Sequence, residues 1–345
     1  MDGIFTLSKD HLRSFLRKIK KTRRLVAPVA NRHGDTMFSV INNLDYAPIE
    51  LNEQTQNGIK SFFFPQQETL SSYSAPEGEY VFTPAVVEPE PTVYFGVRSC
   101  DLMAIIHMDN VFLGETRDLQ YETKRKNSIM IGLNCNTPFE NCFCNATKSG
   151  PFLGSGFDLQ FTDQGDHYLV QVGRDKGADL IRKWQHFFTP ATEEDLQKQY
   201  QLSLEAMASI QLNVHADQAM QRLQSGRVPE EIWETLSQRC QHCGGCSFTC
   251  PTCTCFTIVD RKLSATHGER QRNWDACTLS GFTQMAGGHN PVNHKTDAIR
   301  QFFMHKLCYN VLDHGRPSCV GCGRCVGICF GGVDIVRFIK MAGEN

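Results

Sequence analysis

The stretch Cys240–Phe256 reads CQHCGGCSFTCPTCTCF and holds six of the 16 cysteines of the chain. Its first four cysteines follow the spacing C-x2-C-x2-C-x3-C-P, and the spacing of the cysteines recurs in CVGCGRCVGIC at Cys319–Cys329. Three thiols spaced three residues apart can wrap one face of a metal–sulfur cluster, because glycines between them let the backbone come close. Two copies of such a specific pattern indicate that these thiols bind metal.

The same spacing is typical of bacterial two-cluster ferredoxins, in which the fourth cysteine of each motif ligates the cluster of the other motif. The rule predicts two [4Fe–4S] clusters bound through iron. The first would be held by Cys240, Cys243, Cys246 and Cys329. The second would be held by Cys319, Cys322, Cys325 and Cys250. A pair of four-cysteine zinc sites is the alternative, but it leaves the x3-Cys-Pro ending of the first motif unexplained.

The two motifs are separated by a long insert, and Asp297–Val311 within it has the apolar periodicity of a helix. We therefore expect residues 239–345 to form a helical ferredoxin-like domain rather than the compact ββ type. Residues 181–238 also have a helical pattern, with Thr192 and Asp195 placed as a capping pair, and we interpret them as a connector.

The N-terminal half has a different pattern. Ser8 is placed as the N-cap of an amphipathic helix over residues 8–19. Short apolar runs that predict strands follow at Leu25–Val26, Thr92–Val97, Ser128–Leu133 and Tyr168–Val172. These features predict an α/β domain with a mixed sheet over residues 1–180, and hence an α+β fold for the whole chain.

A second group of cysteines lies in this N-terminal half. Cys100 and Cys135 each follow a predicted strand, and Cys142 and Cys144 lie in the loop sequence ENCFC. Residues two apart in an extended segment project to the same side, so both loop thiols could reach one metal. The four cysteines could hold a third [4Fe–4S] cluster, a zinc ion, or nothing if they are small buried core residues.

Four cysteines remain: Cys253, Cys255, Cys277 and Cys308. Their spacing does not match a ligand pattern, so we expect packing or an influence on the neighbouring cluster through burial and S–H contacts. Cys308 falls in a predicted helix and is most simply a core residue. The sequence does not reveal what Cys253, Cys255 and Cys277 do.

Composition excludes several other classes of protein. The net charge of −2 provides no electrostatic basis for binding nucleic acid or an anionic membrane, and no apolar run is long enough to span a bilayer. Clustered cysteines without an export signal favour a cytoplasmic protein with reduced thiols. No G-x-G-x-x-G motif follows a predicted strand and no P-loop is present, so we expect no flavin or NAD site in this chain. No catalytic residues can be assembled from the sequence.

Further pieces of the sequence point to one family. They are GVRSCDLMAI (96–105), NCNTPFENCFCNA (134–146), WDAC (274–277), GGHNP (287–291) and MHKL (304–307), together with the two cysteine motifs. With these pieces the chain resembles, over roughly residues 90–335, the β subunits of cytoplasmic sulfhydrogenases and the related A subunits of anaerobic sulfite reductases.

The resemblance implies an iron–sulfur electron-transfer subunit of a hetero-oligomeric redox complex in an anaerobe. Its partners would be a flavin subunit that handles NAD(P)H and a catalytic subunit, either a hydrogenase or a sulfite or sulfur reductase. The chain itself would be non-catalytic. The alternatives are a zinc-stabilised scaffold without a redox role and a free-standing reductase with its own substrate site. The terminal donor or acceptor and the direction of electron flow cannot be derived from the sequence.

Overall fold

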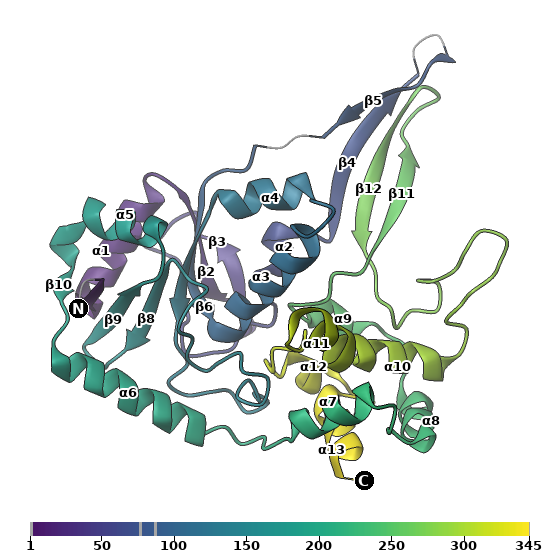
Figure 1. Cartoon of the computed structure of the whole chain (residues 1–345). Helices are drawn as coiled ribbons and strands as arrows, with labels where there is room; N and C mark the ends of the chain where they lie inside the picture. Colours follow the sequence, from purple (N-terminus) through teal and green to yellow (C-terminus); the bar gives the residue numbers. More distant parts are fainter. Residues whose placement is uncertain (1–2, 76–77, 86–87, 345) are drawn as a thin grey trace.

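The computed structural model describes residues 3–75, 78–85 and 88–344. Residues 1–2, 76–77, 86–87 and 345, which belong to the predicted domains, lie outside the described residues. The fold is α+β, as predicted (Figure 1). A large sheet with its helices occupies the N-terminal half, and helices with two cysteine-rich loops make up most of the C-terminal part.

The large sheet has the strand order β10-β1-β9-β8-β7-β6-β2-β3. Its strands are β1 (Ile4–Ser8), β2 (Arg24–Ala30), β3 (Thr36–Val40), β6 (Thr92–Arg98), β7 (Ser128–Leu133), β8 (Leu159–Asp163), β9 (His167–Val172) and β10 (Thr189–Pro190). The central pairs β2–β6, β6–β7 and β7–β8 are parallel, and the outer pairs are antiparallel. The mixed sheet predicted from the apolar runs is therefore confirmed, and β6 and β7 are buried along their whole length.

Helices cover both faces of this sheet. Helices α1 (Lys9–Lys20) and α5 (Asp175–Lys183) share one apolar core with it, and α1 begins at Ser8, whose side chain accepts a hydrogen bond from the Asp10 N–H. Another core contains residues of α2 (Lys60–Phe63), α3 (Ser99–Phe112) and α4 (Leu119–Lys126). The parallel arrangement brings the carboxyl ends of β6 and β7 to one edge, where α3 begins.

A second sheet of four antiparallel strands projects from the molecule (Figure 1). Its order is β11-β12-β4-β5, with β4 (Gln67–Ser74), β5 (Val81–Pro84), β11 (Phe256–Lys262) and β12 (His267–Trp274). The β11–β12 hairpin lies in the insert between the cysteine motifs and was not predicted. Its strands pair with each other, and β12 also pairs with β4, a partner about 200 residues earlier in the chain that periodicity cannot reveal.

The remaining helices lie mostly around the cysteine motifs, except that the first of them, Glu193–Ala208, lies beside the large sheet (Figure 1). They are α6 (Glu193–Ala208), α7 (Ala216–Gln224), α8 (Glu230–Arg239), α9 (Gly245–Thr249), α10 (Lys295–Met304), α11 (Asn310–His314), α12 (Arg324–Ile328) and α13 (Ile335–Glu344). The predicted capping pair Thr192 and Asp195 forms a capping box at α6. Phe338 stacks on Phe303 and on Trp233, with ring centroids 4.3 and 5.0 Å apart, and these rings form the centre of this part of the core.

The predicted division into three parts, residues 1–180, 181–238 and 239–345, stays a prediction. The projecting sheet joins strands from the first part with strands from the third.

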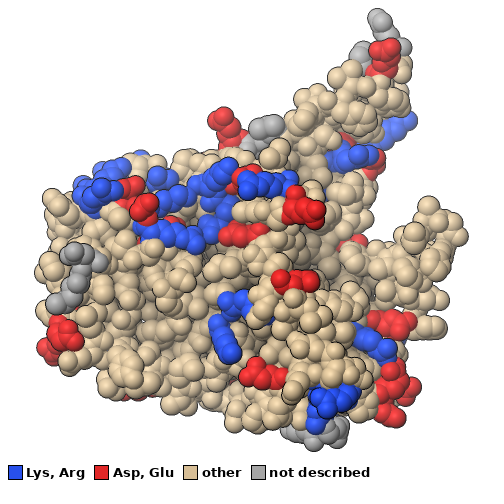
Figure 2. All heavy atoms as spheres, viewed as in Figure 1, with Lys and Arg blue, Asp and Glu red and all other residues tan. Residues whose placement is uncertain are grey.

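On the face shown in Figure 2, Lys and Arg side chains gather where α1, α4 and α5 lie, with acidic side chains among them. Within the described part of the chain, every helix is too short or too polar to cross a membrane.

Candidate metal centres

The two cysteine motifs fold in the same way. In the first, His242 and Gly244 have left-handed backbone conformations, with φ of 52° and 72°, just before the short helix α9. In the second, Gly321 and Gly323 occupy the equivalent positions, with φ of 58° and 75°, just before α12. Positive φ favours glycine because a Cβ strains this backbone conformation, and the first motif carries His242 at one of these positions.

Backbone N–H groups point at the first sulfur of each motif. The His242 N–H donates to Cys240 Sγ over 3.4 Å, and the Gly321 N–H donates to Cys319 Sγ over 3.4 Å. Such donors stabilise negative charge on sulfur, and a cysteine ligates metal as the negatively charged thiolate.

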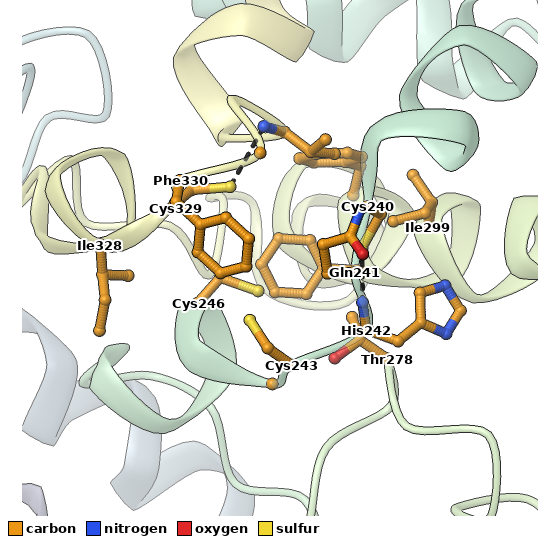
Figure 3. Close-up of a pocket in the computed structure, with 15 residues that line it drawn as sticks. Cys240, Gln241, His242, Cys243, Cys246, Thr278, Ile299, Ile328, Cys329 and Phe330 are labelled. Carbon is orange, nitrogen blue, oxygen red and sulfur yellow. Dashed lines mark hydrogen bonds between the residues drawn. The ribbon is translucent and has the colours of Figure 1, made fainter.

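The four cysteines of the predicted first cluster line one pocket. Figure 3 shows Cys240, Cys243, Cys246 and Cys329 around a common space. Cys329 reaches it from the end of the second motif, and its Sγ accepts a hydrogen bond from the Val333 N–H over 3.2 Å. Most other lining side chains are apolar, including those of Ile299, Phe302 and Phe303 from α10. An apolar wall around four sulfur donors suits an iron–sulfur cluster.

The four cysteines of the predicted second cluster are also neighbours. Burial raises the pKa of Cys325 well above its usual value, and negative charge on the nearby Cys322, Cys319 and Cys250 raises it further. Cys250 comes from the end of the first motif, so the exchange of fourth cysteines expected from the spacing matches the positions of these residues. Neutral thiols at this density need a bound cation to become thiolates, so this donor set fits an iron centre.

The N-terminal cysteines gather at the edge of the large sheet. Cys100 is the second residue of α3, which directly follows β6, and Cys135 follows β7, the parallel neighbour of β6. Burial, and next the charge of Cys135, raises the pKa of Cys142 to about 12. Burial, followed by the charges of Cys142 and Cys135, also raises the pKa of Cys144. The structure thus brings the four residues together, while their role as ligands stays a prediction.

This N-terminal group lies against the second motif, a contact that the sequence did not indicate. The Phe143 N–H donates to Gly321 O over 2.9 Å, and Ser149 Oγ donates to Val320 O over 2.7 Å. The Cys142 thiol lies 3.8 Å from Cys322 O. Cys100 and Cys322 belong to one small buried cluster. The second and third groups of cysteines are therefore adjacent.

Three of the remaining cysteines, Cys253, Cys255 and Cys277, belong to close thiol pairs at or just after the end of the first motif. The thiols of Cys253 and Cys250 are hydrogen-bonded to each other, as are those of Cys277 and Cys255. Cys308 is buried in the core, as predicted. Among the residues that the structure describes, no three or more His, Cys, Asp or Glu side chains are arranged to hold a single metal ion.

A buried lysine accompanies these pairs, which sequence reasoning missed. Lys306 is 2% exposed, and burial by itself lowers the pKa of its ammonium group. The charges of Cys250, Cys253 and Cys319 outweigh that effect and raise the pKa well above its usual value. The only available signal was the MHKL sequence, in which a lysine occupies an apolar stretch.

With this geometry described, comparison with known proteins identifies the cysteine-rich part. Residues 239–333 match the 4Fe-4S dicluster domain family. The chain is also similar to the sulfhydrogenase 2 subunit beta of Pyrococcus furiosus, with 29% identity over 341 residues. The aligned region covers 98% of each chain. The resemblance to sulfhydrogenase β subunits that the motifs indicated is therefore confirmed, and it extends through the first 90 residues as well.

Proposed function

We propose that this chain is an iron–sulfur electron-transfer subunit of a multi-subunit redox complex. The observation that carries the proposal is the shared pocket of Cys240, Cys243, Cys246 and Cys329, in which the last residue of one motif completes the set of the other. This exchange is characteristic of two-cluster ferredoxins. It matches the dicluster domain over residues 239–333.

The three groups of neighbouring cysteines described above supply the proposed ligand sets. The first [4Fe–4S] cluster would be held by Cys240, Cys243, Cys246 and Cys329. The second would be held by Cys319, Cys322, Cys325 and Cys250. A third would be held by Cys100, Cys135, Cys142 and Cys144. Such clusters supply one-electron transfer when bound.

The order of the three groups supports a relay. Cys250 and Cys246 are close enough for their charges to interact, which links the first and second groups. Cys142 lies against Cys322, which links the second and third groups. The second group therefore lies between the other two, and electrons would pass along a continuous row of sites.

The first group opens to the surface. Cys243 is exposed, and Ile328 and Phe330 beside it are 49% and 76% exposed. A partner that covers this patch would approach the first cluster closely and exclude water from it. We infer that one end of the relay is here.

The partners follow from the resemblance to a sulfhydrogenase subunit. One would be a flavin subunit that handles NAD(P)H, and the other a catalytic hydrogenase or sulfite or sulfur reductase subunit. The assembly would be a cytoplasmic hetero-oligomer. The enzymatic activity belongs to the complex, so this chain alone should not act on NAD(P)H, hydrogen or sulfite.

Anaerobic purification of the full chain tests the proposal. We expect a brown protein whose broad visible absorption is bleached by dithionite, with iron and sulfide in equal amounts. A colourless protein with stoichiometric zinc would instead support the zinc-stabilised scaffold. Reduction of sulfite by the isolated chain with a reduced viologen donor would show a free-standing reductase.

A further inference from the structure

Lys306 lies on an irregular turn of helix that places its charge in the core. Residues His305–Tyr309 form a π-helical turn between α10 and α11. Such turns are rare and frequently occur at functional sites. A buried ammonium group is costly unless it is paired, so its hydrogen-bond partners indicate its role.

Its partners form a chain that ends on a cysteine of the second group. Lys306 Nζ lies 2.9 Å from Thr252 Oγ1, and Thr252 Oγ1 lies 3.2 Å from Cys250 Sγ. The ammonium group can only donate, so the Thr252 oxygen accepts from it. A sulfur bound to iron has no proton, so the Thr252 O–H must donate to Cys250 Sγ. The direction of the chain is thereby determined.

The chain is closed off from water. Thr252 is 0% exposed and Lys306 is 2% exposed. The Lys306 carbonyl oxygen also accepts hydrogen bonds from the Ser318 and Cys319 N–H groups, over 3.1 and 3.3 Å. The same lysine therefore approaches two members of the proposed second ligand set, Cys250 through its side chain and Cys319 through its backbone. Because water is excluded here, the positive charge of Lys306 is only weakly screened and acts strongly on the neighbouring sulfur atoms.

We propose that Lys306 and Thr252 are positioning residues that raise the reduction potential of the cluster held by Cys250, Cys319, Cys322 and Cys325. This inference rests on the proposed function. Reduction adds a negative charge to the cluster. A hydrogen bond to a ligand sulfur and a fixed positive charge both stabilise the reduced state, which raises the potential.

A second buried lysine provides a matched control. Lys60 Nζ donates to Cys253 O over 3.1 Å and lies 3.9 Å from the centroid of the Trp274 ring. It is 5% exposed, but it contacts a carbonyl oxygen and an aromatic ring, and no hydrogen bond joins it to a proposed ligand sulfur. The Lys60→Met change removes a buried charge without breaking the Lys306–Thr252–Cys250 chain.

The test is an anaerobic redox titration followed by EPR on the wild type and on the K306M, T252V, T252S and K60M variants. K306M and T252V should shift one cluster signal to a more negative potential. T252S, which keeps the hydroxyl group, should restore the wild-type value. K60M should shift that signal less than K306M. The other cluster signals should stay at their potentials, which a general loss of stability would not explain.

The results separate this proposal from the function on which it rests. If the wild type holds no clusters, the proposed function fails. If T252V keeps its full iron content and every potential is unchanged, the tuning role alone is overturned. Should K306M lose iron, T252V decides, because valine has nearly the shape of threonine and removes the hydroxyl group that links Lys306 to Cys250 while the lysine itself stays in place.

Discussion

Asp101 and Arg324 form a buried, bidentate ion pair between the two halves of the molecule. Arg324 Nη1 lies 2.7 Å from Asp101 Oδ1, and Arg324 Nη2 lies 2.8 Å from Asp101 Oδ2. Each residue is the direct neighbour of a proposed ligand, Cys100 on α3 or Cys325 on α12. The pair therefore aligns the N-terminal cysteine group with the second motif.

Replacement of one partner should strongly destabilise the protein. In Asp101→Ala the Arg324 guanidinium, whose side chain is 3% exposed, would lose the carboxylate that neutralises its charge. The expected loss in the free energy of unfolding is about 3–5 kcal/mol, the usual cost of leaving a buried charge unpaired. Denaturant unfolding under anaerobic conditions measures it. Asp179→Ala, which removes an exposed pair with Arg182, is the control and should have little effect. Equal losses in the two variants would contradict the role given to the buried pair.

The contact between the N-terminal loop and the second motif depends on a glycine. A Cβ at Gly321 would lie 2.6 Å from Phe143 O and 2.7 Å from Cys144 Cα, so Gly321→Ala must displace the loop. Gly315 has a similar φ of 71°, but a Cβ there would meet nothing within 4 Å. Gly315→Ala should therefore cost only the strain of the left-handed conformation, roughly 1–2 kcal/mol. Gly321→Ala should lower the melting temperature further and reduce the iron content. Identical behaviour of the two variants would show that the loop does not depend on this contact.

Removal of thiols from the N-terminal group tests the third cluster. The double change Cys142→Ser and Cys144→Ser should lower the iron content per chain by one [4Fe–4S] cluster, because two of four ligands are lost. Cys308→Ser, at a buried core position that belongs to none of the proposed ligand sets, should leave the iron content as in the wild type. If the double variant keeps all its iron, these cysteines do not bind a cluster.

Single cysteine changes in the two motifs test the exchange of fourth ligands. Cys329→Ser should perturb the same EPR signal as Cys243→Ser, because both residues line the first pocket. Cys250→Ser should perturb the signal that responds to Cys322→Ser. The exchange is wrong if Cys250→Ser and Cys243→Ser change one common signal while Cys329→Ser changes the other.

Stability should decrease as the pH falls below 6.5, partly through His107. Burial, followed by the positive charges of Lys306 and His305, lowers the pKa of His107 from 6.5 to about 3. The nearby Cys250 acts in the opposite direction, and His314 adds to the lowering. Between pH 6.5 and about 3 the unfolded chain therefore binds a proton that the folded chain does not, so acid favours unfolding.

The His107→Gln variant isolates this contribution. The free energy of unfolding of the wild type, relative to the variant, should fall by up to about 1.4 kcal/mol per pH unit below pH 6.5. Denaturant unfolding of both proteins at pH 7.5, 6.5 and 5.5 provides the comparison. A difference that stays constant across these pH values would show that His107 takes up its proton in the folded state as well.

Local features of the fold were predictable because they depend on neighbours in the sequence. The apolar stripe predicted for α1 includes Phe15, Leu16 and Ile19, and these three side chains are buried as the helical period requires. Strands β6 and β7 are apolar runs whose limits differ from the predicted ones by at most one residue. The hairpin of β11 and β12 was missed because β11 is exposed along its length and has no apolar alternation. It is held in a sheet by pairing with the distant β4.

The sequence by itself determined that this protein has two cluster-type cysteine motifs, because ligand spacing and the glycines between ligands are properties of one short segment. It also placed Cys100 and Cys135 at strand ends. Only the tertiary structure decided that the N-terminal cysteines lie against the second motif, and that Lys306 and Thr252 lead to Cys250. Those arrangements depend on the parallel pairing of β6 with β7, on the buried Asp101–Arg324 pair and on a π-helical turn. Each joins residues far apart in the chain or departs from regular helical geometry, so no local pattern in the sequence encodes it.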